Sequence, residues 1–216
     1  MFFYAYILML LLIIFMCINL IFDCFKCPVK IRRIVIVLTV FLAIRYAVML
    51  CMCLKKSIDY IYFIRPFILL DLVCIPLLIL IMIFVFTRKV KFNFLHALAM
   101  IFIFVGLYGV LLSKILKTAV PYYNYNFGYL IDFKGNELTI TIIRIIMYVL
   151  FLILCGFFIG GKNARKAGFC FLMIVLLINI VENISVIVVP KVMPEYLCGE
   201  ILFLICLNYM VRLFKN

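Results

Sequence analysis

Long apolar runs separated by short polar segments constrain the fold of this chain more than any other feature. Each run is long enough to cross a bilayer as a helix, which takes about 20 residues. Hydrophobic residues make up 71% of the 216 residues, whereas a soluble domain averages about 45–50%. A core built from a chain of this length cannot bury so much apolar surface in water. The sequence therefore predicts that lipid surrounds most of the side chains.

We expect an all-α fold, a polytopic transmembrane bundle of about seven helices that forms one integral membrane domain over residues 1–216. The predicted spans are Phe2–Phe22, Ile34–Leu54, Ile61–Phe86, Leu95–Leu112, Leu138–Ile159, Phe169–Val189 and Leu197–Leu213. Asp23, and not a small-residue cleavage site, follows the first span. We therefore interpret this span as a retained helix and not as a cleaved signal peptide.

The basic residues predict the orientation of the bundle. The formal net charge of +13 does not indicate nucleic-acid binding, because Lys and Arg lie in short clusters between the apolar runs. Alternate loops form two sets, and one set holds roughly twice as many Lys and Arg residues as the other. The richer set predicts a cytoplasmic C-terminus, with the N-terminus outside, in a multi-pass protein of a cell membrane. The abundance of Ile, Leu, Phe and Lys is typical of an A/T-rich coding sequence and favours a bacterial source.

Several ionisable residues lie inside the apolar runs, where a charge costs about 2.5–3.5 kcal/mol on insertion scales. One further set, Asn179, Glu182 and Asn183, has the spacing i, i+3, i+4 and so shares a helix face. A rise of about 1.5 Å per residue along each predicted helix places these ionisable and amide side chains in the middle-to-outer half of the bundle. The predicted ligand-binding residues are Arg45, Arg65, Asp71, Arg144, Asn179, Glu182 and Asn183.

Two interpretations of these polar groups stay open. In the first they are structural, with Arg45 paired to Asp71, Arg144 paired to Glu182, and Arg65 extended toward the headgroups. In the second they line an outward-facing cavity. Three arginines against two carboxylates leave one positive charge, which would bind an anionic or carboxylate-bearing small ligand.

The longest polar segment, residues 117–137, is rich in tyrosine and lies on the predicted outer side. We interpret it as a linker along the membrane interface, with a cap over an outer pocket as the alternative. Turn residues Lys134-Gly135-Asn136 predict that Gly128–Phe133 pairs with the chain that follows it. Pro76, inside the third span, predicts a kink.

Three further motif searches give weaker information about function. Cys24 and Cys27 form a C-x-x-C, which we interpret as incidental cysteines, with a redox pair as the alternative. Gly156 and Gly160 form a G-x-x-x-G, from which we expect close helix packing within the bundle. No motif of a metalloprotease, serine hydrolase or intramembrane aspartyl protease is present. We expect no enzymatic activity, no cofactor and no metal site.

The leading functional hypothesis is a ligand-sensing or signalling membrane module. It would have a polar pocket in its outer half and short inner loops that dock a membrane or cytoplasmic protein partner. A small-solute or ion permease is the alternative, and a membrane scaffold subunit is another. In each case the lipid bilayer is a partner and nucleic acid is not.

Overall fold

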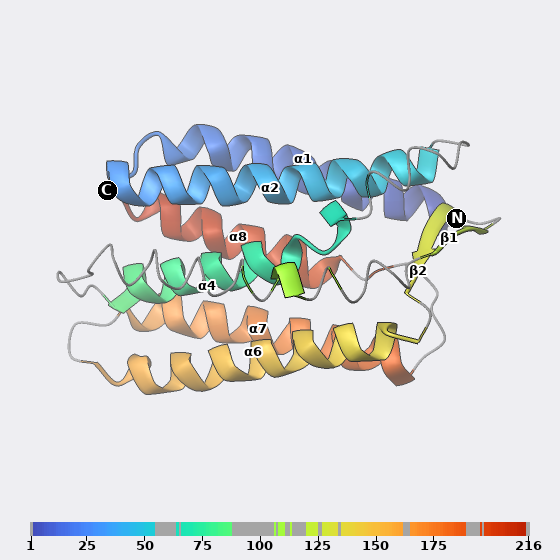
Figure 1. Cartoon of the computed structure of the whole chain (residues 1–216). Coiled ribbons are helices and arrows are strands. Elements are labelled where there is room, and N and C mark those ends of the chain that lie inside the picture. Colours follow the sequence, from blue (N-terminus) through green and yellow to red (C-terminus); the bar gives the residue numbers. More distant parts are fainter. Residues whose placement is uncertain are drawn as a thin grey trace.

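The structure, a computed structural model, is a bundle of long helices with a small β hairpin at one end (Figure 1). It describes residues 2–54, 64, 66–87, 106, 108–110, 113, 120–124, 127–133, 135–161, 165–188, 195 and 197–214. The helices are α1 (Phe2–Cys24), α2 (Val29–Leu54), α4 (Asp71–Thr87), α6 (Glu137–Ile159), α7 (Lys166–Val188) and α8 (Cys198–Arg212). The strands are β1 (Val120–Asn124) and β2 (Gly128–Asp132).

Five helices in the described part of the chain are long and apolar enough to cross a membrane. They are α1, α2, the segment Pro66–Thr87 that contains α4, α6 and α7. This result confirms the all-α class and indicates a multi-pass membrane protein. The count of seven stays a prediction. Most of the expected fourth span, Leu95–Leu112, lies outside the described residues, and α8 has only 15 residues.

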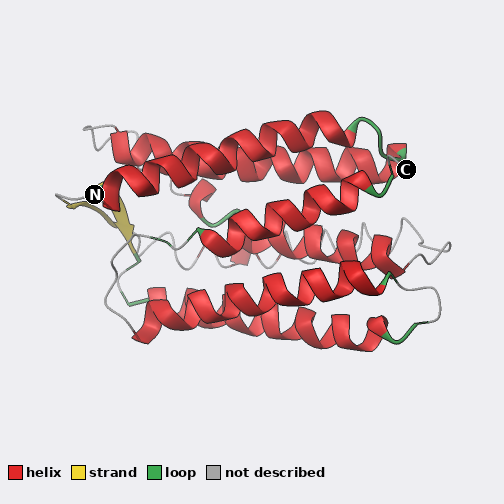
Figure 2. Ribbon diagram, turned by 180° about the vertical axis from the view of Figure 1, so that it is seen from behind, coloured by secondary structure: helices red, strands yellow, loops and turns green. Residues whose placement is uncertain are grey.

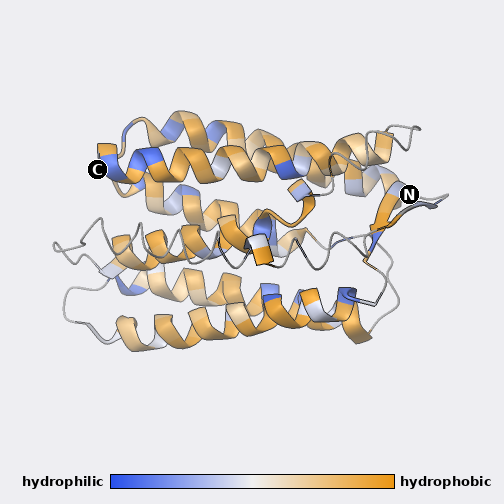
Figure 3. Ribbon diagram, viewed as in Figure 1, coloured by the Kyte–Doolittle hydropathy of each residue, from blue (hydrophilic) through white to orange (hydrophobic). Residues whose placement is uncertain are grey.

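The outer surface of the bundle is apolar, as a lipid-facing surface must be. Colouring by hydropathy shows long apolar stretches on every helix, interrupted by few hydrophilic positions (Figure 3). Large apolar side chains on this surface are highly exposed, for example Phe157 at 79% and Val188 at 75%.

The two ends of the bundle differ in charge. The N-terminus and the β hairpin lie at one end, which we call the hairpin end, and the C-terminus lies at the other (Figure 1). We call the second end the basic end, because the loops and helix termini there carry most of the described Lys and Arg residues. These residues are Lys26, Lys30, Arg32, Arg33, Arg165, Lys166 and Arg212.

Helix α4 is the centre of the bundle. It contacts α2, α6, α7 and α8. The view from behind shows that the helices run side by side along the length of the bundle (Figure 2). In an 18-residue apolar stretch of each segment, 72% of the residues are buried in Pro66–Thr87 but only 17% in α6. Helix α1 packs on α2 and α8 through a stripe with a spacing of three and four residues, as expected for helices that pack side by side. This stripe consists of Tyr6, Leu10, Ile13, Cys17, Leu20 and Cys24.

The third expected span is interrupted close to its hairpin end. Residues 66–68 are helical, Leu69 and Leu70 form a turn, and α4 begins at Asp71. The amides of Leu72 and Val73 bond to carbonyls three residues back, at 3.1 and 3.2 Å. Pro76 lies inside α4. The interruption matters because it frees a backbone carbonyl, that of Ile68, at membrane depth.

The β hairpin corrects the prediction for the outer loop. Strand β2 pairs antiparallel with the segment before it, β1, and not with the chain that follows, and Tyr122 lies opposite Leu130. Gly128 follows the hairpin turn with φ +82°, a conformation that L side chains rarely adopt. A Cβ at Gly128 would lie 2.8 Å from the carbonyl oxygen of Cys53, so the hairpin rests directly on the end of α2.

The G-x-x-x-G of α6 also corrects a prediction. Gly156 and Gly160 are exposed, and a Cβ built at either one meets no atom of the described residues within 4 Å. These glycines therefore do not mediate packing inside the described bundle.

Candidate functional site

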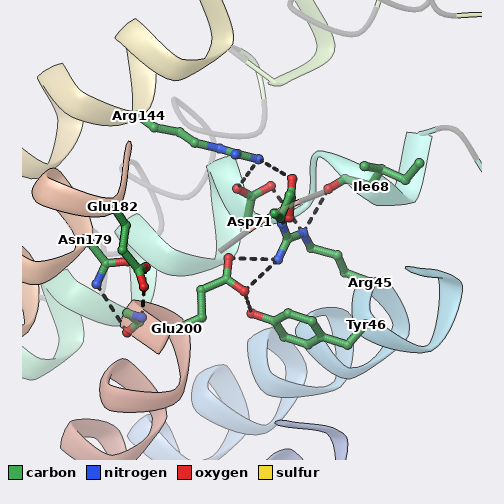
Figure 4. A network of polar contacts seen from close by, with 10 residues as sticks. Arg45, Tyr46, Ile68, Asp71, Arg144, Asn179, Glu182 and Glu200 are labelled. Carbon is green, nitrogen blue, oxygen red and sulfur yellow. Dashed lines mark hydrogen bonds and ion pairs between the residues drawn. The ribbon is translucent and has the colours of Figure 1, made fainter. Parts of the chain in front are cut away.

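Arg45, on α2, is the best-bonded ionisable group of the interior. Its side chain is 0% exposed. Nε donates to the carbonyl oxygen of Ile68 at 2.9 Å, which satisfies the carbonyl freed by the interruption before α4. Nη1 donates to Glu200 at 3.0 and 3.2 Å, and Nη2 donates to Glu195 at 2.6 Å (Figure 4). Each guanidinium nitrogen thus has a partner.

A second arginine closes the cluster. Nη2 of Arg144, on α6, lies 2.9 Å from Oδ2 of Asp71 and 3.4 Å from Oε1 of Glu195. Oδ1 of Asp71 lies 3.5 Å from Nε of Arg45 (Figure 4). We call this set the ion network. It consists of Arg45, Asp71, Arg144, Glu195 and Glu200.

Local structure explains why two of the carboxylates lie here. Asp71 and Glu200 are in the first turns of α4 and α8. The amide groups of a helix N-terminus carry partial positive charge, which favours a nearby carboxylate. Glu200 also accepts a hydrogen bond of 2.5 Å from the hydroxyl of Tyr46, one residue after Arg45. The turn at Leu69 and Leu70 therefore places Asp71 at a helix start in the middle of a predicted span.

The ion network has the opposite charge balance to the predicted one. Its two arginines face three carboxylates, which leaves a formal charge of −1 if all are ionised. Glu195 and Glu200 are not among the predicted residues, because the first lies in a loop and the second lies near the edge of the expected last span. The surplus of arginine over carboxylate in the predicted set was the signal that further carboxylates were needed.

The predicted polar face of α7 forms a second cluster. Oε2 of Glu182 accepts a hydrogen bond of 2.9 Å from the amide of Gly199, at the start of α8. Nδ2 of Asn179 donates to Gly199 O at 3.3 Å and to Val175 O at 2.8 Å, and Asn183 donates to Asn179 O at 2.8 Å. The predicted pair of Arg144 with Glu182 is therefore wrong. Glu182 caps α8 because the free amides at that helix end need acceptors.

The structure brings three of the predicted residues together and places three more beside them. Arg45, Asp71 and Arg144 meet in the ion network, and the expected pair of Arg45 with Asp71 is present. Asn179, Glu182 and Asn183 lie in the neighbouring cluster on α7 and border the same cavity. Arg65 lies outside the described residues.

This cavity lies between the helices at the hairpin end and has a volume of about 200 Å³. Asp71, Arg144, Glu195 and Glu200 line it beside apolar side chains of α2 such as Met49. The hairpin also lines it, so the hairpin is a cap over a pocket and not only an interfacial linker. The hairpin and its flanks contribute Tyr122, Asn124, Phe127, Tyr129, Leu130, Ile131 and Phe133.

The sequence matches no family model, and comparisons with the curated proteins and with the solved structures found no significant match.

Proposed function

We propose that this chain is a ligand-sensing or signalling membrane protein whose small polar ligand binds in the cavity under the hairpin. One observation carries the proposal. The carboxylate partners of a fully buried arginine border a cavity of about 200 Å³ that the hairpin covers. Buried charges in a membrane protein are expensive and mark functional sites more often than other residues do. A pocket lined by a few convergent polar groups is the expected form of a small-molecule site.

The packing of the basic half favours a sensor over a permease. Phe86 packs against Phe169 with ring centroids 5.8 Å apart and against Tyr209 at 6.3 Å. Phe86 and Phe169 have no exposed surface. A transport path through this part of the described bundle would have to displace these rings. Permease and scaffold subunit therefore stay as alternatives without an observation in their favour.

The ion network offers a route from the ligand to the basic end. It joins α2, α4 and α6 to the start of α8, and α8 runs from there to the basic end. A ligand that replaces one of these ion pairs would change the position of α8. The basic clusters favour a cytoplasmic position for that end, where a protein partner would bind.

Thermal unfolding in nanodiscs with small polar solutes tests this proposal. A solute at about 100 times its Kd stabilises a protein by about 2.7 kcal/mol. Tyr122→Ala alters the cavity lining and should weaken the stabilisation. Tyr4→Ala, on α1 and 77% exposed, is the matched control and should not. Uptake of the same solute by proteoliposomes would contradict the proposal and favour the permease.

A further inference from the structure

We infer that the ligand of the hairpin-end cavity carries a protonated amine, and not the anionic group that the sequence predicts. This inference rests on the proposed function, because it names the ligand class of the same cavity. Among the residues that the structure describes, five carboxylates line the cavity, against one arginine that lines it and a second one behind it. The lining carboxylates are Asp71, Glu137, Glu182, Glu195 and Glu200.

Asp71 provides an acceptor oxygen that has no hydrogen-bond donor among the residues described. Its side chain is 3% exposed, and its Oδ2 is bound to Arg144 at 2.9 Å. Its Oδ1 accepts no hydrogen bond from any residue in the described ranges. Nε of Arg45 lies 3.5 Å away but donates to Ile68 O. A buried acceptor without a partner costs about 1–3 kcal/mol. An ammonium N–H from the cavity would satisfy this oxygen.

The arginines are poorly placed to bind an anion. The three nitrogens of Arg45 donate to Ile68, Glu195 and Glu200. Nε of Arg144 is buried and has no acceptor among the residues described. A single N–H suits one oxygen atom, such as a hydroxyl of the ligand, whereas a carboxylate prefers a two-pronged contact with a guanidinium.

Aromatic rings complete the environment of a cation. The electron-rich faces of Tyr and Phe attract ammonium groups within about 6 Å. In the described part of the chain six such residues line the cavity, from α1, α6 and the hairpin with its flanks. They are Tyr6, Tyr122, Phe127, Tyr129, Phe133 and Tyr148. In the described part of the chain no group of three His, Cys, Asp or Glu side chains could hold a metal ion, so the lining favours an organic cation.

Charge-selective labelling of Cys53 tests the inference directly. Cys53 lines the cavity and is partly exposed. Replacement of the exposed Cys51, Cys170 and Cys198 and of Cys27, which lies between α1 and α2, by Ala leaves Cys53 as the accessible thiol, because the remaining cysteines are buried. The protein in nanodiscs is treated with aminoethyl, hydroxyethyl or sulfonatoethyl methanethiosulfonate. Each rate is divided by the rate of the same reagent with a free thiol in solution.

We expect the ammonium reagent to label Cys53 about tenfold faster than the sulfonate reagent, because an acidic lining concentrates cations. Glu137→Gln and Glu182→Gln, which leave the ion network intact, should reduce this ratio. Asp23→Asn removes the same charge at the end of α1 far from the cavity and should not. The ratio of the two labelling rates in the protein with all its carboxylates decides the charge of the ligand, even where a carboxylate variant fails to fold.

Protection by free probes completes the test. Ethanolamine should slow the labelling of Cys53 by the hydroxyethyl reagent, whereas ethylene glycol and glycolate, of similar size, should not. Faster labelling by the sulfonate reagent, equal normalised rates, or protection by glycolate would overturn the inference and leave the proposed function standing. Failure of all three reagents to label Cys53 would show that the cavity is closed to water and would overturn both.

Discussion

At the scale of single residues, Arg45 determines most of the interior electrostatics. It donates to Ile68, Glu195 and Glu200, and it lies 5.1 Å above the ring of Tyr46. Its 0% exposure means that water replaces none of these contacts. A charge at this depth is tolerated only because its partners are equally buried or close by. Removing it leaves carboxylates in an apolar bundle, which is the most unfavourable single change in the site.

Arg45→Met should destabilise the protein by about 3–5 kcal/mol, because it leaves the buried carboxylates without their main partner. Thermal or denaturant unfolding in nanodiscs measures the effect. Arg45→Met combined with Glu200→Gln should be less destabilised than the sum of the two single variants. Additive effects would contradict direct coupling between the two side chains.

Gly199→Ala should cost about 0.5–2 kcal/mol, the range measured for the loss of a helix cap. An added Cβ would lie 2.6 Å from Oε2 of Glu182 and 2.7 Å from Oδ1 of Asn179, so the cap must move. Gly156→Ala is the matched control, because a Cβ there meets no described atom within 4 Å and α6 is helical at that position. Gly156→Ala should leave the free energy of unfolding unchanged or raise it. A smaller loss for Gly199→Ala than for the control would contradict the cap.

Cys27, between α1 and α2, is the residue whose pH response the structure predicts. A hydrogen bond with Cys24 and the charge of Arg32 lower the pKa of its thiol. Cys24→Ala removes that hydrogen bond, so the pKa of Cys27 should rise and its alkylation should require a higher pH. Mass-spectrometric measurement of iodoacetamide labelling against pH checks the shift. An unchanged midpoint would support the interpretation of incidental cysteines.

At the scale of elements, an interrupted helix and a β hairpin packed on a helix end create the site. A continuous third helix would keep the carbonyl of Ile68 in its own hydrogen-bond ladder. The turn before α4 instead presents this carbonyl and the first turn of α4 to Arg45. The hairpin then covers the hairpin end of the helices, where Gly128 allows it to approach the backbone of α2. Site formation thus depends on a helix interruption and a close strand–helix contact.

Gly128→Ala should loosen the hairpin and speed the labelling of Cys53 by the hydroxyethyl reagent. Both Gly128 (φ +82°) and Gly135 (φ +85°) have conformations that cost a non-glycine residue about 1–3 kcal/mol. Only at Gly128 would a Cβ also clash, 2.8 Å from the carbonyl oxygen of Cys53. Gly135→Ala is therefore the control for backbone strain alone. Equal labelling rates in the two variants would contradict the docking of the hairpin on α2.

At the scale of the whole molecule, the two ends of the bundle differ in the residues that they carry. The hairpin end holds the cavity and the ion network, and the basic end holds the described loop arginines and lysines (Figure 1). Aromatic packing around Phe86 fills the bundle between them. This polarity fits a protein that binds on one side of a membrane and responds on the other.

The proposed orientation predicts which end a membrane-impermeant thiol reagent reaches in intact cells. With Cys27, Cys51, Cys53, Cys170 and Cys198 replaced by Ala, Tyr123→Cys on β1 should be labelled from outside, and Phe25→Cys at the basic end should be labelled only after lysis. Both parent side chains are exposed, at 49% and 58%. Labelling in the reverse order would place the basic clusters outside and contradict the orientation.

The sequence alone determined the membrane class, the approximate helix positions and the location of Arg45, Asp71 and Arg144 inside apolar spans. These properties follow from local composition, because transfer from water to lipid depends on each segment by itself. Only the tertiary structure decided which groups meet. Arg45 and Glu200 are 155 residues apart, and the cap on α8 comes from Glu182 of another helix. Partners across such distances depend on how each helix is rotated and where it starts, so the sign of the site charge and the pairing of the hairpin became visible only in three dimensions.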